Sequence, residues 1–135
     1  MKIVLANGCF DPLHAGHVRH LIEASTLGDE LWVALTVDAA VRKEKGPGRP
    51  VHCWQDRAEL LAALRCVARV VPSENGVEAT LRYRPAVFVK GIDYDGVRDT
   101  ALAALRRACE SVGAELRFTG TPKMSSAETI RRMRA

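Results

Sequence analysis

Two histidines three residues apart, His14 and His17, are the side chains of this 135-residue chain best suited to handle phosphate. They lie in the stretch 7–17, which reads Asn-Gly-Cys-Phe-Asp-Pro-Leu-His-Ala-Gly-His. At the first turn of a helix, a spacing of three puts both imidazoles on one face, where they can donate hydrogen bonds to phosphoryl oxygens. Gly16 has no side chain to hold a ligand away from the backbone. The pattern predicts a site for a polyphosphate.

The segments on either side supply the framework for such a site. Residues 3–6 are a short apolar run typical of a buried strand, and residues 18–27 carry apolar side chains at helical spacing. A strand, a tight turn and a helix bring exposed backbone N–H groups and the positive end of a helix dipole to one point. An anion is the natural ligand there.

The ten residues from Gly8 to His17 resemble the G-x-F-D-x-x-H-x-G-H signature of the cytidylyltransferase-like nucleotidyltransferases. The resemblance implies that His14 and His17 act on the α- and β-phosphates, and that Asp11 lies near the nucleotide or a metal ion. It also implies a set of nucleotide-binding residues in the same motif, namely Gly8, Cys9, Phe10, Asp11 and Gly16.

The rest of the chain alternates strand and helix. We predict strands over 3–6, 31–37, 67–71, 86–90 and 115–118, and helices over 18–27, 39–43, 54–64, 77–83, 99–112 and 126–134. Strands joined by helical crossovers form a parallel, doubly wound α/β sheet, which binds ligands beyond the carboxyl ends of its strands. The resemblance implies a Rossmann-like five-stranded sheet of order 3-2-1-4-5, and the length fits a single domain. We expect Asp38 to cap the helix over 39–43.

A loop predicted over 43–51 contains Lys45-Gly46 and Arg49-Pro50, which resemble a K-G-x-x-R-P segment of sugar-phosphate adenylyltransferases. The resemblance implies that Lys45 is a catalytic, mobile lysine that reaches the nucleotide phosphates. It assigns Arg49 and Arg57 to substrate binding, with Arg57 on the substrate phosphate. The charge pattern alone favours a solvated loop, and Arg57 could be an exposed helix arginine.

Two later segments extend the resemblance. Lys90-Gly91-Ile92-Asp93 resembles the family's strand-4 segment and implies that Lys90, Gly91 and Asp93 bind the nucleotide; Asp93 would contact ribose or Mg²⁺, or simply form a turn. The segment containing Ser125 and Ser126 resembles the family's final phosphate-binding helix start, although Ala127 replaces a usual hydroxyl. A serine there can also be a plain helix cap.

Metal binding by side chains alone is not favoured. His14, His17 and His20, with Asp11 near, match a zinc spacing, but a zinc site needs convergent ligands with fixed second partners. We therefore predict no metal held by protein ligands alone. The cofactor that we expect is Mg²⁺ bridging the nucleotide phosphates.

Composition limits the partners and the compartment. A formal net charge of +4 suits small anions, and no apolar run approaches the length of a membrane span. The four cysteines are widely spaced, which predicts free thiols in a reducing cytoplasm, and the start Met-Lys-Ile-Val-Leu predicts a strand without a leader.

Arg131, Arg132 and Arg134 raise the alternative of a catalytically silent nucleotide- or nucleic-acid-binding module, but no basic strand carries aromatics for base stacking. We expect no nucleic-acid partner, and the resemblance allows a homodimer.

The whole chain resembles the adenylyltransferase half of the bifunctional heptose-phosphate enzymes. That resemblance implies transfer of AMP from ATP to a sugar phosphate such as D-glycero-D-manno-heptose 1-phosphate, with release of pyrophosphate. Glycerol-3-phosphate cytidylyltransferase, which uses CTP, is the second family that the chain is similar to. The partners expected are therefore a nucleoside triphosphate, ATP or CTP, and a phosphorylated small molecule.

Overall fold

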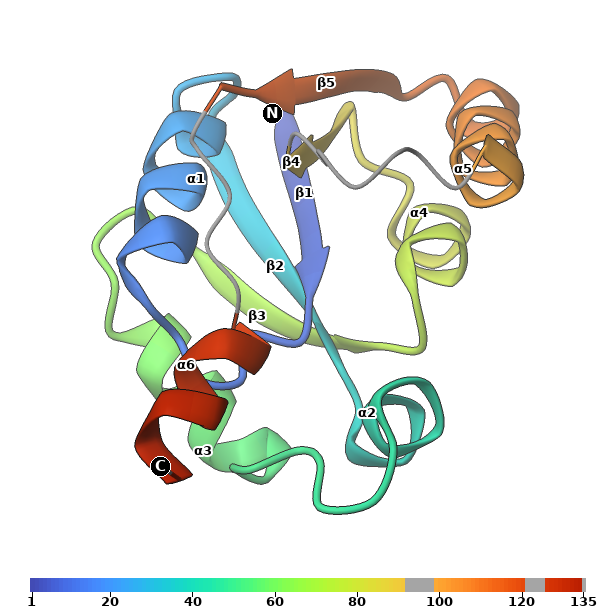
Figure 1. Cartoon of the computed structure of the whole chain (residues 1–135). Coiled ribbons are helices and arrows are strands. Elements are labelled where there is room, and N and C mark those ends of the chain that lie inside the picture. The colour runs from blue at the N-terminus through green and yellow to red at the C-terminus, as the bar shows by residue number, and fades with distance from the viewer. Residues whose placement is uncertain (92–98, 121–125, 135) are drawn as a thin grey trace.

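The computed structural model describes residues 1–91, 99–120 and 126–134, and within them it contains one parallel sheet of order β3-β2-β1-β4-β5 (Figure 1). The strands are β1 (Ile3–Gly8), β2 (Glu30–Thr36), β3 (Arg69–Ser73), β4 (Val87–Gly91) and β5 (Glu115–Thr119). The helices are α1 (Ala15–Ser25), α2 (Asp38–Lys45), α3 (Trp54–Ala62), α4 (Gly76–Tyr83), α5 (Asp99–Val112) and α6 (Ser126–Arg134). The predicted α/β class and strand order are confirmed.

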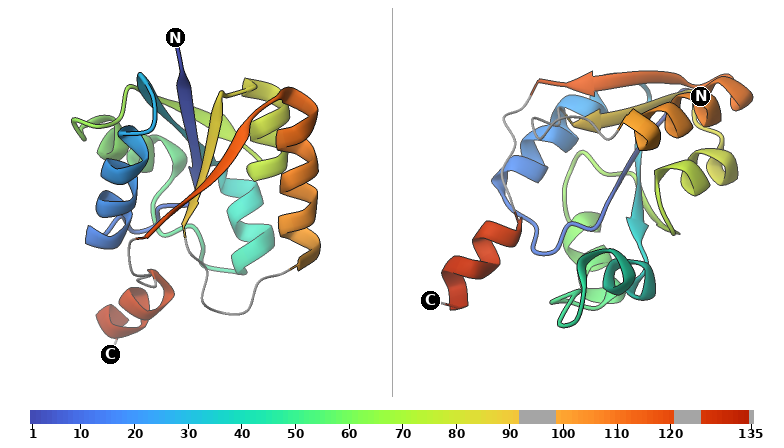
Figure 2. Two further views of the ribbon diagram at one scale, coloured as in Figure 1. Left: turned by 90° about the horizontal axis from the view of Figure 1, so that it is seen from above. Right: turned by 45° about the vertical axis from the view of Figure 1, so that its right-hand side comes forward.

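Helices cover both faces of the sheet (Figure 2). One face of β1 packs with Leu21 of α1 and Leu61 of α3, and the other packs with Ala79 of α4 and Leu105 of α5. Because the central strand is buried on both sides, its sequence is apolar without alternation. Among the described residues, no helix combines the length and apolarity needed to cross a bilayer.

The region after β2 differs from its prediction. Helix α2 begins at Asp38 and runs to Lys45, so Lys45 is the last residue of a helix and not part of the loop predicted over 43–51. The prediction that Asp38 caps this helix is wrong, because the N-cap is Val37 and makes no side-chain cap hydrogen bond. The Asp38 carboxylate instead accepts a hydrogen bond from Arg57 Nη2 at 2.6 Å.

The third strand lies two residues later than predicted. Residues 63–67, which follow α3, form turns. In them, the N–H of Leu64 donates to the Leu61 carbonyl and the N–H of Val67 donates to the Leu64 carbonyl. Pairing with β2 therefore begins at Arg69, opposite Trp32, and ends at Ser73, opposite Thr36. This shift brings residues 74–76 to the carboxyl edge of the sheet, beside the end of β1.

Candidate functional site

His14 and His17 close the N-terminus of α1 by capping each other. The N–H of His17 donates to His14 Nδ1 at 3.3 Å, and the N–H of His14 donates to His17 Nδ1 at 3.2 Å. The two rings stack with centroids 3.6 Å apart and planes 14° from parallel. Since each Nδ1 accepts a backbone hydrogen bond, each neutral ring carries its proton on Nε2. The backbone thus sets both imidazoles as Nε2–H donors.

The turn before α1 packs against the His17 ring through Phe10. Phe10 has a φ of 48°, an unusual conformation for a residue with a side chain. Its ring lies over Gly8, where an added Cβ would approach Phe10 Cε2 to 2.9 Å. The same ring meets His17 edge-on, with centroids 5.0 Å apart. Gly8 is therefore required by Phe10, and Phe10 in turn packs against the imidazole.

Asp11 fastens the segment after α2 to the motif. Its carboxylate accepts from the N–H of Val51 at 2.6 Å, from the N–H of His52 at 2.9 Å and from Arg49 Nε at 3.4 Å. Asp11 lines the large cavity, yet its side chain is fully buried and both of its oxygens accept hydrogen bonds from protein groups. Through its contact with Arg49 Nε, the Asp11 carboxylate holds Arg49 at the site.

Arg57 is buried rather than exposed, with only 1% of its surface accessible. Its guanidinium donates to the carbonyls of His52, Cys9 and Thr36 at 2.8–3.0 Å and to the Asp38 carboxylate. Arg57 is not among the residues that line the cavity. The alternative of an exposed helix arginine is wrong. The structure does not place Arg57 in the cavity where a substrate phosphate could meet it.

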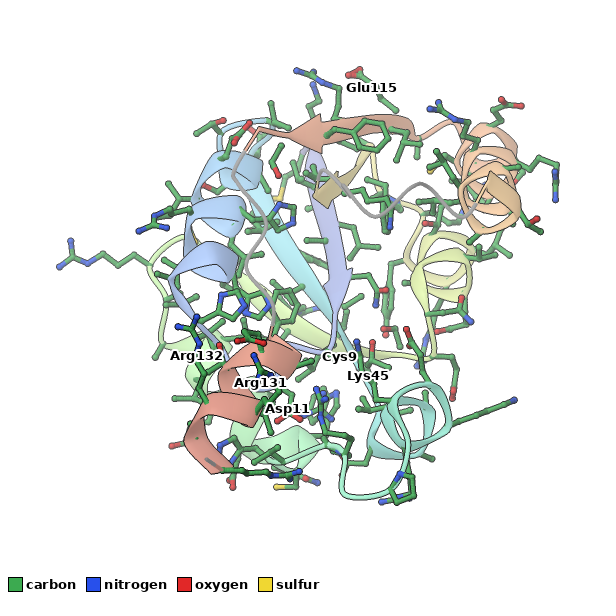
Figure 3. All side chains as sticks on the ribbon, in the orientation of Figure 1. Cys9, Asp11, Lys45, Glu115, Arg131 and Arg132 are labelled. Atoms are coloured by element: carbon green, nitrogen blue, oxygen red, sulfur yellow. The ribbon has the colours of Figure 1, made fainter. Side chains whose placement is uncertain are left out.

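A cavity of about 1250 Å³ opens at the carboxyl edge of β1 and β4. It brings together twelve of the predicted site residues: Gly8, Cys9, Phe10, Asp11, His14, Gly16, His17, Lys45, Arg49, Lys90, Gly91 and Ser126. The Ser126 hydroxyl donates to the Pro12 carbonyl at 3.2 Å. Figure 3 shows Cys9, Asp11 and Lys45 at the end of β1 beside α6, with Glu115 at the opposite end of the sheet. Asp93 and Ser125 lie outside the described residues.

A smaller hollow of about 350 Å³ adjoins this cavity beside α6. Lys45 and Arg49 line both, and Arg131 and Arg134 line the hollow. Arg131 and Arg132 form ion pairs with Glu128 on their own helix, which hold the pKa of the Glu128 carboxyl below its usual range. Part of the positive charge of α6 is therefore balanced locally.

The sequence interpretation missed several cavity residues. His20, which the sequence suggests only as part of a zinc spacing, lines the cavity, and its Nδ1 lies 2.7 Å from Thr119 Oγ1 on β5. Its i, i+3 spacing from His17 on α1 was the signal that could have found it. Asn7, Glu74 and Asn75 also line the cavity, and no motif in the sequence marked them.

Burial keeps His17 uncharged. Burial is the largest cause, and together with the nearby His14, His20 and Lys45 it lowers the pKa of the imidazole from its ordinary 6.5 to about 3. Burial likewise lowers the pKa of His20 and raises that of the Cys9 thiol. At neutral pH, His17 is therefore a neutral Nε2–H donor in a site whose positive charge comes from lysine and arginine.

Acid should weaken the fold through His17. Between pH 6.5 and about 3, the unfolded chain binds a proton at this residue and the folded chain does not. The His17 contribution to the free energy of unfolding is therefore complete above pH 6.5 and falls as the pH is lowered through this window. Urea titrations of wild type and His17→Gln at several pH values measure it. Glutamine is suitable because it keeps a capping group at N3 without titrating. Identical pH dependences for the two proteins would contradict the assignment.

Comparison with known proteins fits this geometry. A profile of the cytidylyltransferase-like family matches residues 5–132. The chain belongs to this family. Within the family, it is 43% identical over 131 residues to the bifunctional protein HldE of Pseudomonas syringae pv. syringae. The aligned region covers 96% of this chain and 27% of that protein. It is 50% identical over 97 residues to the bifunctional protein HldE of Sulfurimonas denitrificans, covering 70% of this chain and 20% of that protein.

This cytidylyltransferase-like chain thus spans about a quarter of the length of these curated relatives. Among solved structures it is similar to a lipopolysaccharide core biosynthesis protein from Thermoplasma volcanium, with a TM-score of 0.75 and 23% identity over 91% of this chain and 99% of that one. At that identity the likeness supports the fold alone.

Proposed function

We propose that this domain is a nucleotidyltransferase that transfers AMP from ATP to a sugar phosphate such as D-glycero-D-manno-heptose 1-phosphate and releases pyrophosphate. The observation that carries the proposal is the pair of stacked imidazoles, both set as Nε2–H donors on one wall of a cavity of about 1250 Å³. Family membership supports the reaction class. The resemblance to the adenylyltransferase half of bifunctional heptose-phosphate enzymes, and the similarity to proteins named HldE, support the choice of ATP and a sugar phosphate.

The chemistry asks little of the protein beyond positioning and charge. The acceptor phosphate is already an anion at neutral pH, so its oxygen can attack the α-phosphorus without a general base while pyrophosphate leaves in line. In the proposed site, His14 and His17 donate to oxygens of the α- and β-phosphates, where negative charge increases in the transition state. Donors fixed in advance by the backbone stabilise that charge without reorganising during the reaction. The neutral imidazole of His17 suits this role.

The remaining cations of the site would offset the charge of the two anionic substrates. Lys45 lies at the end of α2 and Lys90 lies at the end of β4, and both residues line the cavity. Arg49 is oriented by Asp11 at the junction of the cavity with the smaller hollow. We propose that Lys45 contacts the phosphates that react and that Arg49 contributes to binding the substrate.

Mg²⁺ would enter this site on the nucleotide. Among residues 1–91, 99–120 and 126–134, no group of three or more His, Cys, Asp or Glu side chains is arranged to hold a metal ion. Mg²⁺ keeps several waters and is commonly bound through substrate phosphates with few protein ligands, so these residues are compatible with a nucleotide-borne ion. When bound, the ion neutralises charge on the phosphate oxygens that leave.

A phosphate-release assay tests the proposed function. The protein is incubated with Mg²⁺, pyrophosphatase and either ATP or CTP, against sugar 1-phosphates and glycerol 3-phosphate. The proposal predicts release with ATP and a heptose or other sugar 1-phosphate. Release only with CTP and glycerol 3-phosphate would assign the chain to the cytidylyltransferase alternative. Nucleotide binding without release under any pairing would favour a catalytically silent module.

A further inference from the structure

The large cavity extends well beyond the paired histidines. Its volume of about 1250 Å³ exceeds the roughly 300–1,000 Å³ common for a single small-molecule site. One half lies against α1, the end of α2 and the end of β4, with His14, His17, Lys45 and Lys90. We call the other half the α4 half; it lies between the ends of β1 and β3 and helices α4 and α5. The two halves offer different chemistry.

The inner wall of the α4 half is apolar. Val77 of α4, Phe88 of β4, and Ala104 and Leu105 of α5 line it. Gly76 packs closely there, since an added Cβ would lie 3.3 Å from Phe88 Cζ. A wall of this kind suits the C–H surface of a small carbon skeleton and gives no contact that phosphate could use.

Polar groups at the edge of this half have well-defined roles. The Asn7 amide nitrogen donates to the Ala34 carbonyl and to Ser73 Oγ, both at 2.8 Å, so its Oδ1 is the acceptor that remains for a ligand. Asn75 Oδ1 accepts from the N–H of Glu78 at 2.9 Å as the cap of α4, so its NH₂ group is the donor that remains. One amide thus offers an acceptor and its neighbour a donor.

Glu74 adds a charged acceptor beside these amides. Its backbone N–H donates to Glu78 Oε1 at 2.8 Å, and its carboxylate forms no ion pair with any residue in the described part of the chain. Glu78 itself lies 3.8 Å from Arg82 on the next turn of α4. A hydroxyl group both donates and accepts, so it can satisfy the carboxylate and the amides together.

Charge decides which end of an acceptor enters this half. The Glu74 carboxylate repels a phosphate, whereas Glu78 is paired with Arg82 and the lysines of the other half attract a phosphate. We infer that the α4 half is the subsite for the hydroxyl-bearing body of the acceptor, with Glu74, Asn75 and Asn7 hydrogen-bonded to its hydroxyls and its phosphate directed to Lys45 and the histidines. This assignment rests on the proposed function and makes the acceptor a polyol phosphate.

Two variants test the assignment kinetically. Glu74→Ala removes the carboxylate, and Asn75→Ser removes the amide donor while keeping an oxygen that caps α4. Each should raise the KM for the sugar phosphate by about tenfold, the usual scale for a lost hydrogen bond in a site, with the KM for the nucleotide within about twofold of wild type. The matched control is Glu110→Ala, an exposed glutamate of α5 that does not line the cavity. An unchanged acceptor KM in both variants, while wild type transfers, overturns the subsite and leaves the proposed function intact.

Direct binding tests the subsite even if no transfer occurs. In ¹⁵N spectra of the unmodified chain, titration with mannose 1-phosphate should shift the side-chain amide signals of Asn7 and Asn75, and inorganic phosphate should not. Equal shifts with both probes, or no shift with mannose 1-phosphate, would contradict the inference. Absence of transfer with selective amide shifts would count against the proposed function alone.

Discussion

His17→Ala is expected to lower kcat by about 10²–10³-fold, the cost of removing one donor that stabilises transition-state charge. The structure makes the loss specific, because the backbone N–H of His14 bonds His17 Nδ1 and leaves the Nε2–H to the ligand. The initial rate at saturating nucleotide and acceptor measures the effect. A melting curve checks that the variant is folded, since a lost cap costs only about 1 kcal/mol.

His17→Gln is the matched variant for this experiment. Glutamine can retain the capping contact and still present an amide N–H, so it should recover part of the activity that alanine loses. A neutral donor suffices, since burial together with the nearby His14, His20 and Lys45 holds the pKa of His17 to about 3. A kcat for His17→Ala within threefold of wild type would remove His17 from the catalytic residues.

Arg57→Ala is expected to lower the free energy of unfolding by about 3–5 kcal/mol, as the loss of one partner from a buried ionic network does. Three backbone carbonyls and the Asp38 carboxylate would lose their common donor. These acceptors lie in four places: Cys9 in the motif turn, Thr36 at the end of β2, Asp38 at the start of α2 and His52 in the segment before α3. Urea unfolding of the variant and wild type measures the change.

Arg65→Ala is the control, because this arginine is exposed and its loss should alter stability by no more than about 0.5 kcal/mol. Arg57→Lys should remain clearly destabilised, since a single ammonium cannot reproduce a planar fork with several fixed donors. An Arg57→Ala protein with nearly wild-type stability and a raised acceptor KM would restore the direct substrate contact that the family resemblance implied.

The strongest sequence predictions were those that depend on local pattern. Helices over 99–112 and 126–134 have the predicted bounds, because their apolar and charged residues repeat at helical spacing. The motif that contains His14 and His17 does begin a helix, since its capping contacts join residues only three apart. The predicted helix over 18–27 nevertheless begins three residues too late, because α1 starts at Ala15, directly after its cap His14.

Contacts between distant residues could not be predicted in this way. Arg57 lies 48 residues from Cys9, and nothing in Gln55-Asp56-Arg57 indicates that its guanidinium fills the space beneath the motif turn. Asp38 has the residue type of a helix cap, but its ion pair with this arginine decides its position. Asn7 and Asn75 became candidates only when the fold showed which of their atoms are already bonded.

The position of the label in the products shows whether this site transfers a nucleotidyl group. Parallel reactions with [α-³²P]ATP and [γ-³²P]ATP, Mg²⁺ and a sugar 1-phosphate are separated by chromatography. The α label should enter a new sugar nucleotide, and the γ label should leave entirely in pyrophosphate. Transfer of the γ label to the acceptor, or release of labelled orthophosphate without a sugar nucleotide, would contradict nucleotidyl transfer by this site.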